Sequence, residues 1–186
     1  WTYNPQASAA YSLSKSDNVF VIFSDRARFP TLKDSYSYRF NRALPNPDLG
    51  PEHSRNWNIG YTRAFAGRTV AQIEYFRSDL RDSIQTIYIP SGLCPTNTGS
   101  LKGTCGINYN AGKQRHDGVE ISIRTSPHRR FNLDASYSFL DRTMDWDAAR
   151  IPADSLVYLS ALTLPSMTKN KFIGNMTVEL PRQILG

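Results

Sequence analysis

The connections between the predicted strands of this chain alternate strictly between short and long. Seven segments have strand-like patterns; the short connections cover residues 15–18, 66–67 and 126–128, and the long ones cover residues 29–53, 88–114 and 144–168. A sheet with its short turns at one edge and its long loops at the other is an up-and-down meander with two different ends. This rhythm predicts an all-β fold, an antiparallel up-and-down transmembrane β-barrel, of which the chain supplies about seven to eight strands.

Alternation of apolar and polar residues supports strands that have two different faces. Val119, Ile121 and Ile123 alternate with polar neighbours, and the same period of two continues through residues 131–139. A soluble antiparallel sheet also alternates, so a β-sandwich remains an alternative. Two features favour the membrane form: the segment 68–87 is unusually long for a strand, and every hairpin has an apolar face of similar strength.

Composition excludes several other classes of protein. No run of residues approaches the length of an apolar membrane helix, and the mean hydropathy is −0.46. The formal net charge is +6, but the 22 basic residues are scattered, so we predict no nucleic-acid partner. The three histidines lie far apart and no Gly-x-Ser-x-Gly sequence occurs, so no catalytic, metal or cofactor site is predicted and the chain is not expected to be an enzyme.

Two cysteines, Cys94 and Cys105, lie in the second long loop, and the chain contains no others. Their spacing in an irregular loop predicts a disulfide bond formed in an oxidising compartment. Two free thiols in a reducing compartment are the alternative.

Three further residues have a structural interpretation. Gly60 and Gly118 are expected either to allow a close approach on a crowded face that points into the barrel or to allow a bend. Glu120 is expected to pair with basic neighbours such as Arg124 on that polar face.

Six short sequence patterns occur in a characteristic order, each at the strand or loop that the alternation assigns to it. They are RFPTLKD (28–34), NPDLGPE (46–52), WNIGY (57–61), YFRSDLRDSI (75–84), NAGKQRHDGVE (110–120) and YSFLD (137–141). Together they resemble the patterns of TonB-dependent receptors of Gram-negative outer membranes, and the resemblance covers roughly residues 7–180. It implies a place in the cell outer membrane, with outer-membrane lipid around the barrel and the long loops outside the cell.

The resemblance also implies what this chain lacks. Members of the family have a barrel of about 22 strands, a plug domain inside it and a short segment that contacts TonB. Residues 1–186 are therefore expected to be a partial barrel domain, with the plug domain and the C-terminal strands absent. Contact with the TonB complex would take place through the missing plug.

The family's activity is the uptake of a scarce metal chelate, such as a ferric siderophore or cobalamin, without bond chemistry by the barrel. The resemblance places the ligand mouth in the long loops, where aromatic and basic side chains suit a small anionic chelate. The candidates are Tyr36, Tyr38, Arg39, Arg42, Tyr88 and Tyr109. The alternative function is that of a small outer-membrane or surface β-barrel or sandwich that acts as an adhesin or structural protein.

Overall fold

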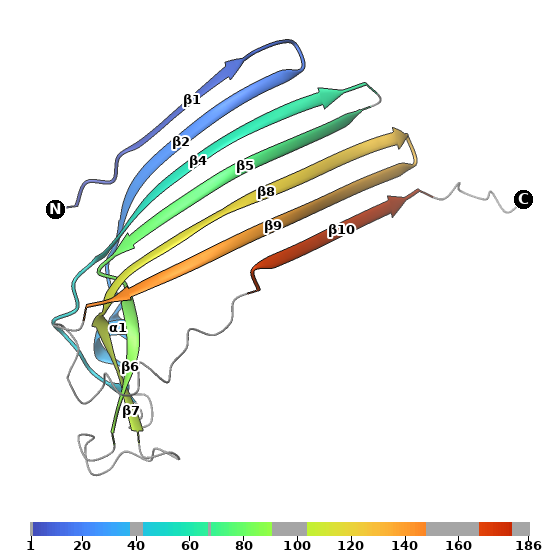
Figure 1. Ribbon diagram of the computed structural model, residues 1–186. Coiled ribbons are helices and arrows are strands. Elements are labelled where there is room, and N and C mark those ends of the chain that lie inside the picture. The colour runs from blue at the N-terminus through green and yellow to red at the C-terminus, as the bar shows by residue number, and fades with distance from the viewer. Residues whose placement is uncertain (1, 38–42, 67, 91–103, 148–167, 180–186) are drawn as a thin grey trace, which may run out of the picture.

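Seven strands form one antiparallel sheet in the computed structural model, which describes residues 2–37, 43–66, 68–90, 104–147 and 168–179 (Figure 1). The strand order is β1-β2-β4-β5-β8-β9-β10, so the strands of this sheet are neighbours in the order in which they follow along the chain. The predicted all-β, antiparallel up-and-down meander is confirmed. The strands are β1 (Gln6–Ser12), β2 (Asp17–Arg28), β4 (Glu52–Phe65), β5 (Thr69–Arg81), β8 (Gly112–His128), β9 (Phe131–Trp146) and β10 (Asn170–Val178).

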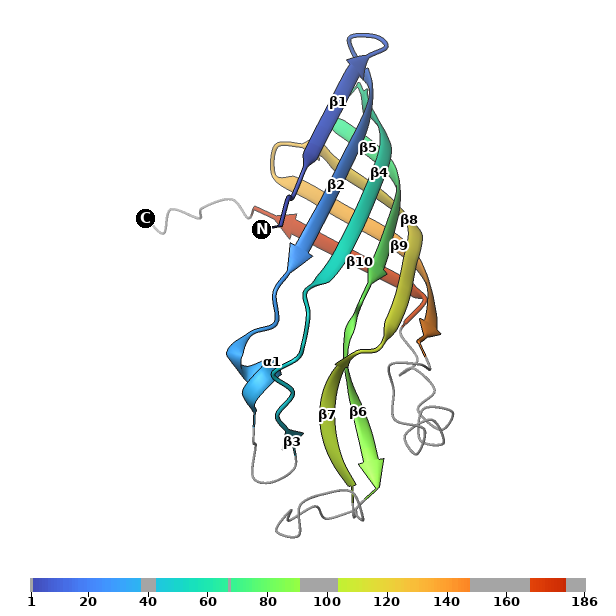
Figure 2. The same cartoon turned by 90° about the vertical axis from the view of Figure 1, so that its left-hand side faces the viewer.

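Two of the long connections have structure of their own. Helix α1 (Leu32–Tyr36) and strand β3 (Ala43–Leu44) lie between β2 and β4, and strands β6 (Ile84–Pro90) and β7 (Thr104–Asn110) lie between β5 and β8. Strands β3, β7 and β6 form a second sheet, in which β3 runs parallel to β7. In Figure 2 these elements lie together beyond one end of the large sheet, and the short turns lie at the other end.

The segment 68–87, which the sequence predicts as one long strand, is divided into two strands. Strand β5 ends at Arg81, Asp82 has a positive φ of 52°, and β6 begins at Ile84. The returning chain bends at the same level, at Gly112, where φ is 148°. The buried Ser83 joins the two bends, because its amide donates to the Gly112 carbonyl (3.0 Å) and its carbonyl accepts from the Ala111 amide (2.9 Å). The hairpin β6–β7 therefore leaves the direction of the large sheet at a fixed point.

The register of the large sheet aligns side chains of one kind in rows. One row of cross-strand partners runs from β4 to β10 and consists of Tyr61, Ile73, Ile121, Tyr137 and Phe172. On the same face of the sheet, the residues of the neighbouring rows are also apolar. The opposite side is mainly polar. The apolar face comprises Val19, Val21, Ile59, Tyr61, Ile73, Tyr75, Val119, Ile121, Tyr137, Phe139 and Phe172. The polar face includes Asn58, Gln72, Glu74, Glu120, Ser122, Ser136 and Ser138.

The apolar face has no covering layer among the described residues. Ile59, Ile73 and Ile121 lie on interior strands, yet their exposed fractions are 54%, 46% and 46%. A β-sandwich would bury these side chains under a second sheet. The sandwich alternative is therefore wrong, and the exposed apolar face agrees with a sheet whose outer side contacts lipid.

Buried apolar side chains occur at the long-loop end of the molecule. Within the described residues they are Leu49, Ile87, Cys105 and Ala111, and Tyr109 and Trp146 pack against the pair Ile87 and Ala111. The hydrophobic core thus stabilises the loop structure rather than the large sheet. No helix in the described part of the chain is long and apolar enough to cross a membrane.

Two glycines on the polar face allow the close approach that the sequence predicts. Gly60 pairs with Phe20 and Gly118 pairs with Phe76 on the neighbouring strand. A Cβ atom at Gly60 would overlap the Phe20 ring, and one at Gly118 would overlap the Phe139 carbonyl oxygen and lie 2.8 Å from the Phe76 ring. Each aromatic ring therefore covers the backbone of a glycine on the next strand.

We expect Gly118→Ala to destabilise the sheet by about 1–3 kcal/mol, because the added methyl group meets a backbone oxygen that cannot rotate away. The measurement is the free energy of unfolding of the complete lipid-reconstituted protein in urea. Gly174→Ala is the control, since its Cβ would come no closer than 3.6 Å to the Phe172 ring. Equal stabilities of the two variants would contradict the close packing at Gly118.

Candidate functional site

A pocket of about 270 Å³ lies at the long-loop end. It is formed by the end of β2, by α1 and by the small sheet β3-β7-β6, so its walls come from the first two long connections. We call it the loop-end pocket. Its lining residues are Arg28, Lys33, Asp34, Ser37, Ala43, Leu44, Ile84, Thr86, Gly106 and Asn108.

Arg28 joins the large sheet to the wall of the loop-end pocket. Its Nε donates to Glu52 Oε1 at 2.7 Å, and its Nη1 lies 3.3 Å from Asp34 Oδ2. Arg28 and Glu52 are cross-strand partners, whereas Asp34 belongs to α1. The guanidinium group therefore holds the short helix close to the end of the sheet, and its own charge is balanced by two carboxylates.

The helix α1 is only five residues long and depends on its N-terminal cap. The Asp34 amide donates to Thr31 Oγ1 (3.1 Å), and the Thr31 amide donates to Asp34 Oδ2 (2.9 Å), which forms a capping box. The hydrogen bond from the Thr31 amide, aided by the charge of Arg28 and opposed by desolvation, lowers the pKa of Asp34 below its ordinary value.

We expect the helix to lose stability at acid pH. Because the pKa of Asp34 is lower in the folded state, its stabilising effect is complete above the ordinary value of 3.8 and is lost as the pH falls through the folded-state value. Hydrogen exchange of residues 31–37 at a series of pH values measures the effect. Asp34→Asn should remove the pH dependence, and an unchanged pH profile in this variant would contradict the assignment.

Asn108 connects three elements around the loop-end pocket. Its Nδ2 donates to the Asp34 carbonyl (2.9 Å), its Oδ1 accepts from Thr86 Oγ1 (2.7 Å), and its carbonyl accepts from Asn46 Nδ2 (2.8 Å). One side chain thus fixes α1 against β6 and β7. The loop that returns to β4 is attached at the same residue.

Asn110 connects the loops to the bend between β5 and β6. Its Nδ2 donates to the carbonyl oxygens of Gly50 (3.0 Å) and Asp82 (2.8 Å), and its Oδ1 accepts from the Gly50 amide (2.8 Å). The side chain uses both its donor and its acceptor atoms on backbone groups. It therefore sets the distance between the first and second long connections.

The predicted ligand-mouth residues do not all lie in the described part of the chain. Tyr36 is the last residue of α1 and Tyr88 lies on β6, and both side chains are exposed. The Tyr88 side chain lies on the same side of β6 as that of Thr86, and Thr86 lines the loop-end pocket. Tyr38, Arg39 and Arg42 lie outside the described residues.

Tyr109 and Cys105 lie on β7, and both belong to the small hydrophobic clusters at the long-loop end. Tyr109 is partly buried against Ile87 and Ala111, and burial raises the pKa of its phenol, so the hydroxyl is neutral at physiological pH. Cys105 is fully buried, and no described cysteine has a free thiol. Cys94 lies outside the described residues, so its bond to Cys105 stays a prediction.

The loop-end pocket combines one available cation with neutral hydrogen-bonding groups. Lys33 forms no ion pair with another described residue, while Thr86, Ser37 and Asn108 supply hydroxyl and amide groups. Such a set can bind an anionic polar ligand reversibly and offers no activated nucleophile. Lys33, Thr86 and Asn108 could not be selected from the sequence, because only the folding of two separate loops brings them together.

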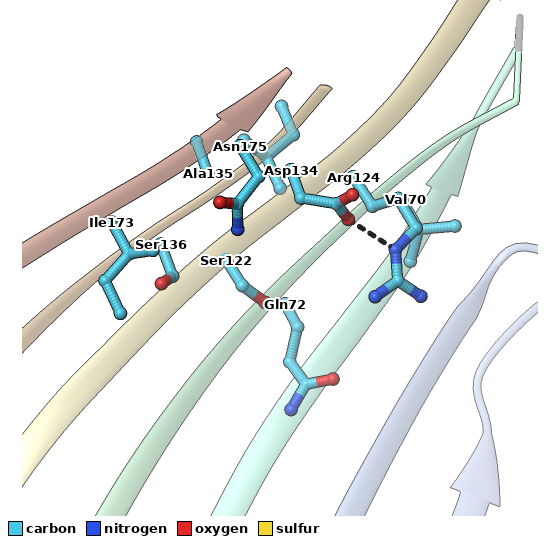
Figure 3. A pocket seen from close by; sticks show the side chains of 10 residues that line it. Val70, Gln72, Ser122, Arg124, Asp134, Ala135, Ser136, Ile173 and Asn175 are labelled. Atoms are coloured by element: carbon cyan, nitrogen blue, oxygen red, sulfur yellow. Dashed lines mark hydrogen bonds and ion pairs between the residues drawn. The ribbon is translucent and has the colours of Figure 1, made fainter. Parts of the chain in front are cut away.

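The polar face of the large sheet has a second hollow, of about 340 Å³, shown in Figure 3. Within it Arg124 Nε lies 2.6 Å from Asp134 Oδ1 on the adjacent strand. The expected pairing of Glu120 with Arg124 is therefore wrong, since the cross-strand aspartate is closer to Arg124. The lining residues are Val70, Gln72, Ser122, Ile123, Arg124, Asp134, Ala135, Ser136, Ile173 and Asn175.

Two glutamates lie side by side on the polar face. Glu74 on β5 and Glu120 on β8 are direct cross-strand partners. Glu74 accepts hydrogen bonds from Asn58 and Gln72, whereas Glu120 forms no ion pair with a described residue. Like charges in this position destabilise a sheet unless a cation lies close to them. The pair therefore gives this part of the polar face a local negative charge.

Comparison with known proteins identifies a family and a fold. Residues 1–177 match the family model described as TonB dependent receptor-like, beta-barrel. A comparison with curated protein sequences finds no match.

Solved structures with a similar fold include the siderophore receptor PirA from Pseudomonas aeruginosa (TM-score 0.63, 19% identity, 78% of this chain and 29% of that one). The FrpB iron transporter from Neisseria meningitidis has a TM-score of 0.57 and 15% identity over 81% of this chain and 21% of its own. The hemophore receptor HasR from Serratia marcescens, in complex with HasA and heme, has a TM-score of 0.60 and 17% identity over 96% of this chain and 28% of its own. The chain thus spans less than a third of these proteins, and at such identities the likeness shows the fold alone.

Proposed function

The chain belongs to the TonB-dependent receptor-like β-barrel family, and on this premise we propose that it is part of an outer-membrane receptor that imports a small metal chelate. The exposed apolar face carries this proposal, because interior strands in water would not leave a continuous row of isoleucine and aromatic side chains uncovered. In the proposed orientation the apolar face contacts lipid, the polar face lines the barrel, and the long-loop end lies outside the cell.

We further propose that the large sheet is one part of a closed barrel of about 22 strands. Strands β1 and β10 each have one neighbour among the described residues, and every residue of both strands is exposed. An open sheet edge is not stable in lipid, because its backbone groups have no water to bind. Further strands of the complete receptor would pair with both edges.

The plug domain and the TonB complex are proposed partners of the complete protein. The adjacent carboxylates of Glu74 and Glu120 support this, since they point to a basic surface inside the barrel. Import would then proceed by capture of the ligand outside, a TonB-dependent movement of the plug, and release inward. The barrel would perform no bond chemistry.

The ligand is proposed to bind at the loop-end pocket and at the aromatic residues around it. Lys33 provides a cation, and Tyr36 and Tyr88 provide exposed aromatic surface for a chelate. Tyr38, Arg39 and Arg42 are proposed to complete the mouth. A Cys94–Cys105 disulfide would fix the second loop, and alkylation of the unreduced protein would then label neither cysteine.

Uptake by cells that express the complete receptor tests the proposed function. A panel of radiolabelled ferric siderophores, heme and cobalamin would be offered to cells with and without TonB. The proposal expects energy-dependent uptake of one class of ligand, lost in the strain without TonB. Binding of proteins or glycans to the cell surface without any uptake would instead support the adhesin alternative.

Reversal of the charge at Lys33 should weaken capture of an anionic chelate. We expect Lys33→Glu to raise the dissociation constant about tenfold, the effect of losing one charge-assisted hydrogen bond. Equilibrium binding to whole cells measures it. Lys15→Glu, at a short turn, is the control with the same change in charge. An unchanged affinity in Lys33→Glu would exclude the loop-end pocket as the capture site.

A further inference from the structure

The direction of the hairpin β6–β7 depends on contacts at the two bends where it leaves the large sheet. Asp82 and Gly112 both have a positive φ there, of 52° and 148°. This backbone conformation lies outside the strand region, so the ladder of the large sheet does not carry its direction across the bends. The hydrogen bonds around Ser83, the residue that precedes β6, therefore set the angle at which the hairpin leaves the sheet.

The hydroxyl group of Ser83 is held by Gln114, which lies on β8 of the large sheet. The exposed fractions of Ser83 and Gln114 are 1% and 5%, so their polar atoms need partners within the protein. Gln114 Nε2 donates to Ser83 Oγ at 2.6 Å, and Gln85 Nε2 donates to the same oxygen at 2.9 Å. A side chain of the large sheet is thus bound to the start of the hairpin.

Arg142 fixes the orientation of the Gln114 amide group. Its Nε and Nη2 atoms donate to Gln114 Oε1 at 3.1 and 2.7 Å, and His116 Nε2 lies 3.3 Å from that oxygen. A guanidinium group can only donate, so the amide oxygen faces Arg142 and the amide nitrogen is left for Ser83. Arg142 and His116 are cross-strand partners on the polar face. The contacts therefore run from the polar face to the bend.

The bend positions one wall of the loop-end pocket. Ile84 follows Ser83 directly and lines the pocket, and Thr86, on the same side of β6, lines it too. Arg28, at the end of β2 in the large sheet, forms another part of the lining. A change in the angle of the hairpin would therefore move Ile84 and Thr86 relative to Arg28 and change the shape of the pocket.

We propose that Gln114 is a positioning residue for ligand capture, through which Arg142 on the polar face sets the geometry of the loop-end pocket. This inference rests on the proposed function, in which the polar face lines the barrel and the pocket captures the chelate. Gln114 does not contact the chelate and acts through Ser83. Capture outside the cell then depends on the hydrogen-bonded series Arg142–Gln114–Ser83, which begins inside the barrel.

Binding and uptake by cells that express the complete receptor separate this role from a merely structural one. The probes are the radiolabelled ferric siderophores, heme and cobalamin of the uptake panel, and the probe that wild-type cells import is offered to each variant. Gln114→Met keeps the length of the side chain and removes its hydrogen bonds to Arg142 and Ser83. It should raise the dissociation constant at least fivefold, the lower end of typical coupling between two sites.

The maximal TonB-dependent uptake rate per receptor should be unchanged in Gln114→Met, because the pocket is misplaced but the transport step is intact. A residue that only stabilises the fold would instead leave fewer receptors with unchanged affinity, and that result would overturn the inference.

Ser83→Ala tests the same contact with a smaller change. It removes one oxygen atom and keeps the backbone hydrogen bonds to Ala111 and Gly112, so the bend should still fold. We expect a similar loss of affinity, and adding Gln114→Met to it should have little further effect, because both substitutions remove the same contact. Losses of affinity that add up in the double variant would contradict the inference.

Ser126→Ala is the matched control, because it also removes a serine hydroxyl with a 2.6 Å hydrogen bond, to Asn132 near a short turn. Its affinity should equal that of the wild type. Unchanged affinity in both Gln114→Met and Ser83→Ala would refute this inference alone. Absence of TonB-dependent uptake of every probe by wild-type cells would refute the proposed function.

Discussion

Ile121→Arg should destabilise the complete receptor by about 2–4 kcal/mol in lipid, the cost of an arginine on the lipid-facing side of a barrel near the bilayer centre. Ile121 lies in the middle of the apolar face, between Ile73 and Tyr137 on the adjacent strands, with 46% of its surface exposed. In water the same substitution would have almost no cost, since the side chain is already accessible. The size of the destabilisation therefore shows whether lipid or water surrounds this face.

The adjacent residue provides the matched control. Ser122 pairs with Gln72 and Ser136 on the polar face, so Ser122→Arg should change the free energy of unfolding by less than about 1 kcal/mol. Both variants would be unfolded with urea from vesicles of one lipid composition. A larger loss for Ser122→Arg than for Ile121→Arg would mean that the two faces are assigned the wrong way round.

Asn110→Asp should release the second long loop with little change in the large sheet. The new carboxylate would keep an acceptor for the Gly50 amide, but it would face the carbonyl oxygens of Gly50 and Asp82 in place of an amide donor. Loss of these two hydrogen bonds should cost about 2–4 kcal/mol of local stability. Hydrogen exchange should then become faster in β6 and β7 while the middle of β8 stays protected, and chelate binding should weaken with it.

Asn132→Asp is the control for this substitution. Its Oδ1 accepts from Ser126 Oγ at 2.6 Å near a short turn, and the carboxylate can keep that contact. We expect unchanged exchange in β6 and β7 for this variant. If Asn110→Asp also left the exchange of these strands unchanged, Asn110 would not be the residue that holds the two loops together.

The large sheet could be predicted from the sequence because its information is local. A period of two along residues 119–124 fixes which side chains share a face. The short connection predicted at residues 126–128 lies instead between His128 and Phe131, because β8 continues to His128 with a register irregularity after Thr125. The resemblance to TonB-dependent receptors then indicated that the sheet is part of a barrel. The bend at Asp82 could not be predicted in this way, because residues 68–87 remain strand-like on both sides of it.

The loop-end pocket could not be predicted in the same way. Its walls depend on contacts such as that between Asn108 and Asp34, which are 74 residues apart in the chain. No pattern in either loop indicates that contact. Candidate mouth residues chosen for their side-chain type therefore include Tyr109, which is half-buried in the loop core, and omit Lys33, which lines the pocket.

The central claim is that the two faces of the large sheet meet different environments, lipid on one side and a polar lumen on the other. Spin labels placed singly at residues 119–124 of β8, in the complete receptor in vesicles, test it directly. Val119, Ile121 and Ile123 should be accessible to oxygen and protected from a water-soluble nickel reagent, and the labels at the three intervening positions should not be exposed to lipid. The same accessibility at all six positions, or oxygen access at 120, 122 and 124, would contradict the account.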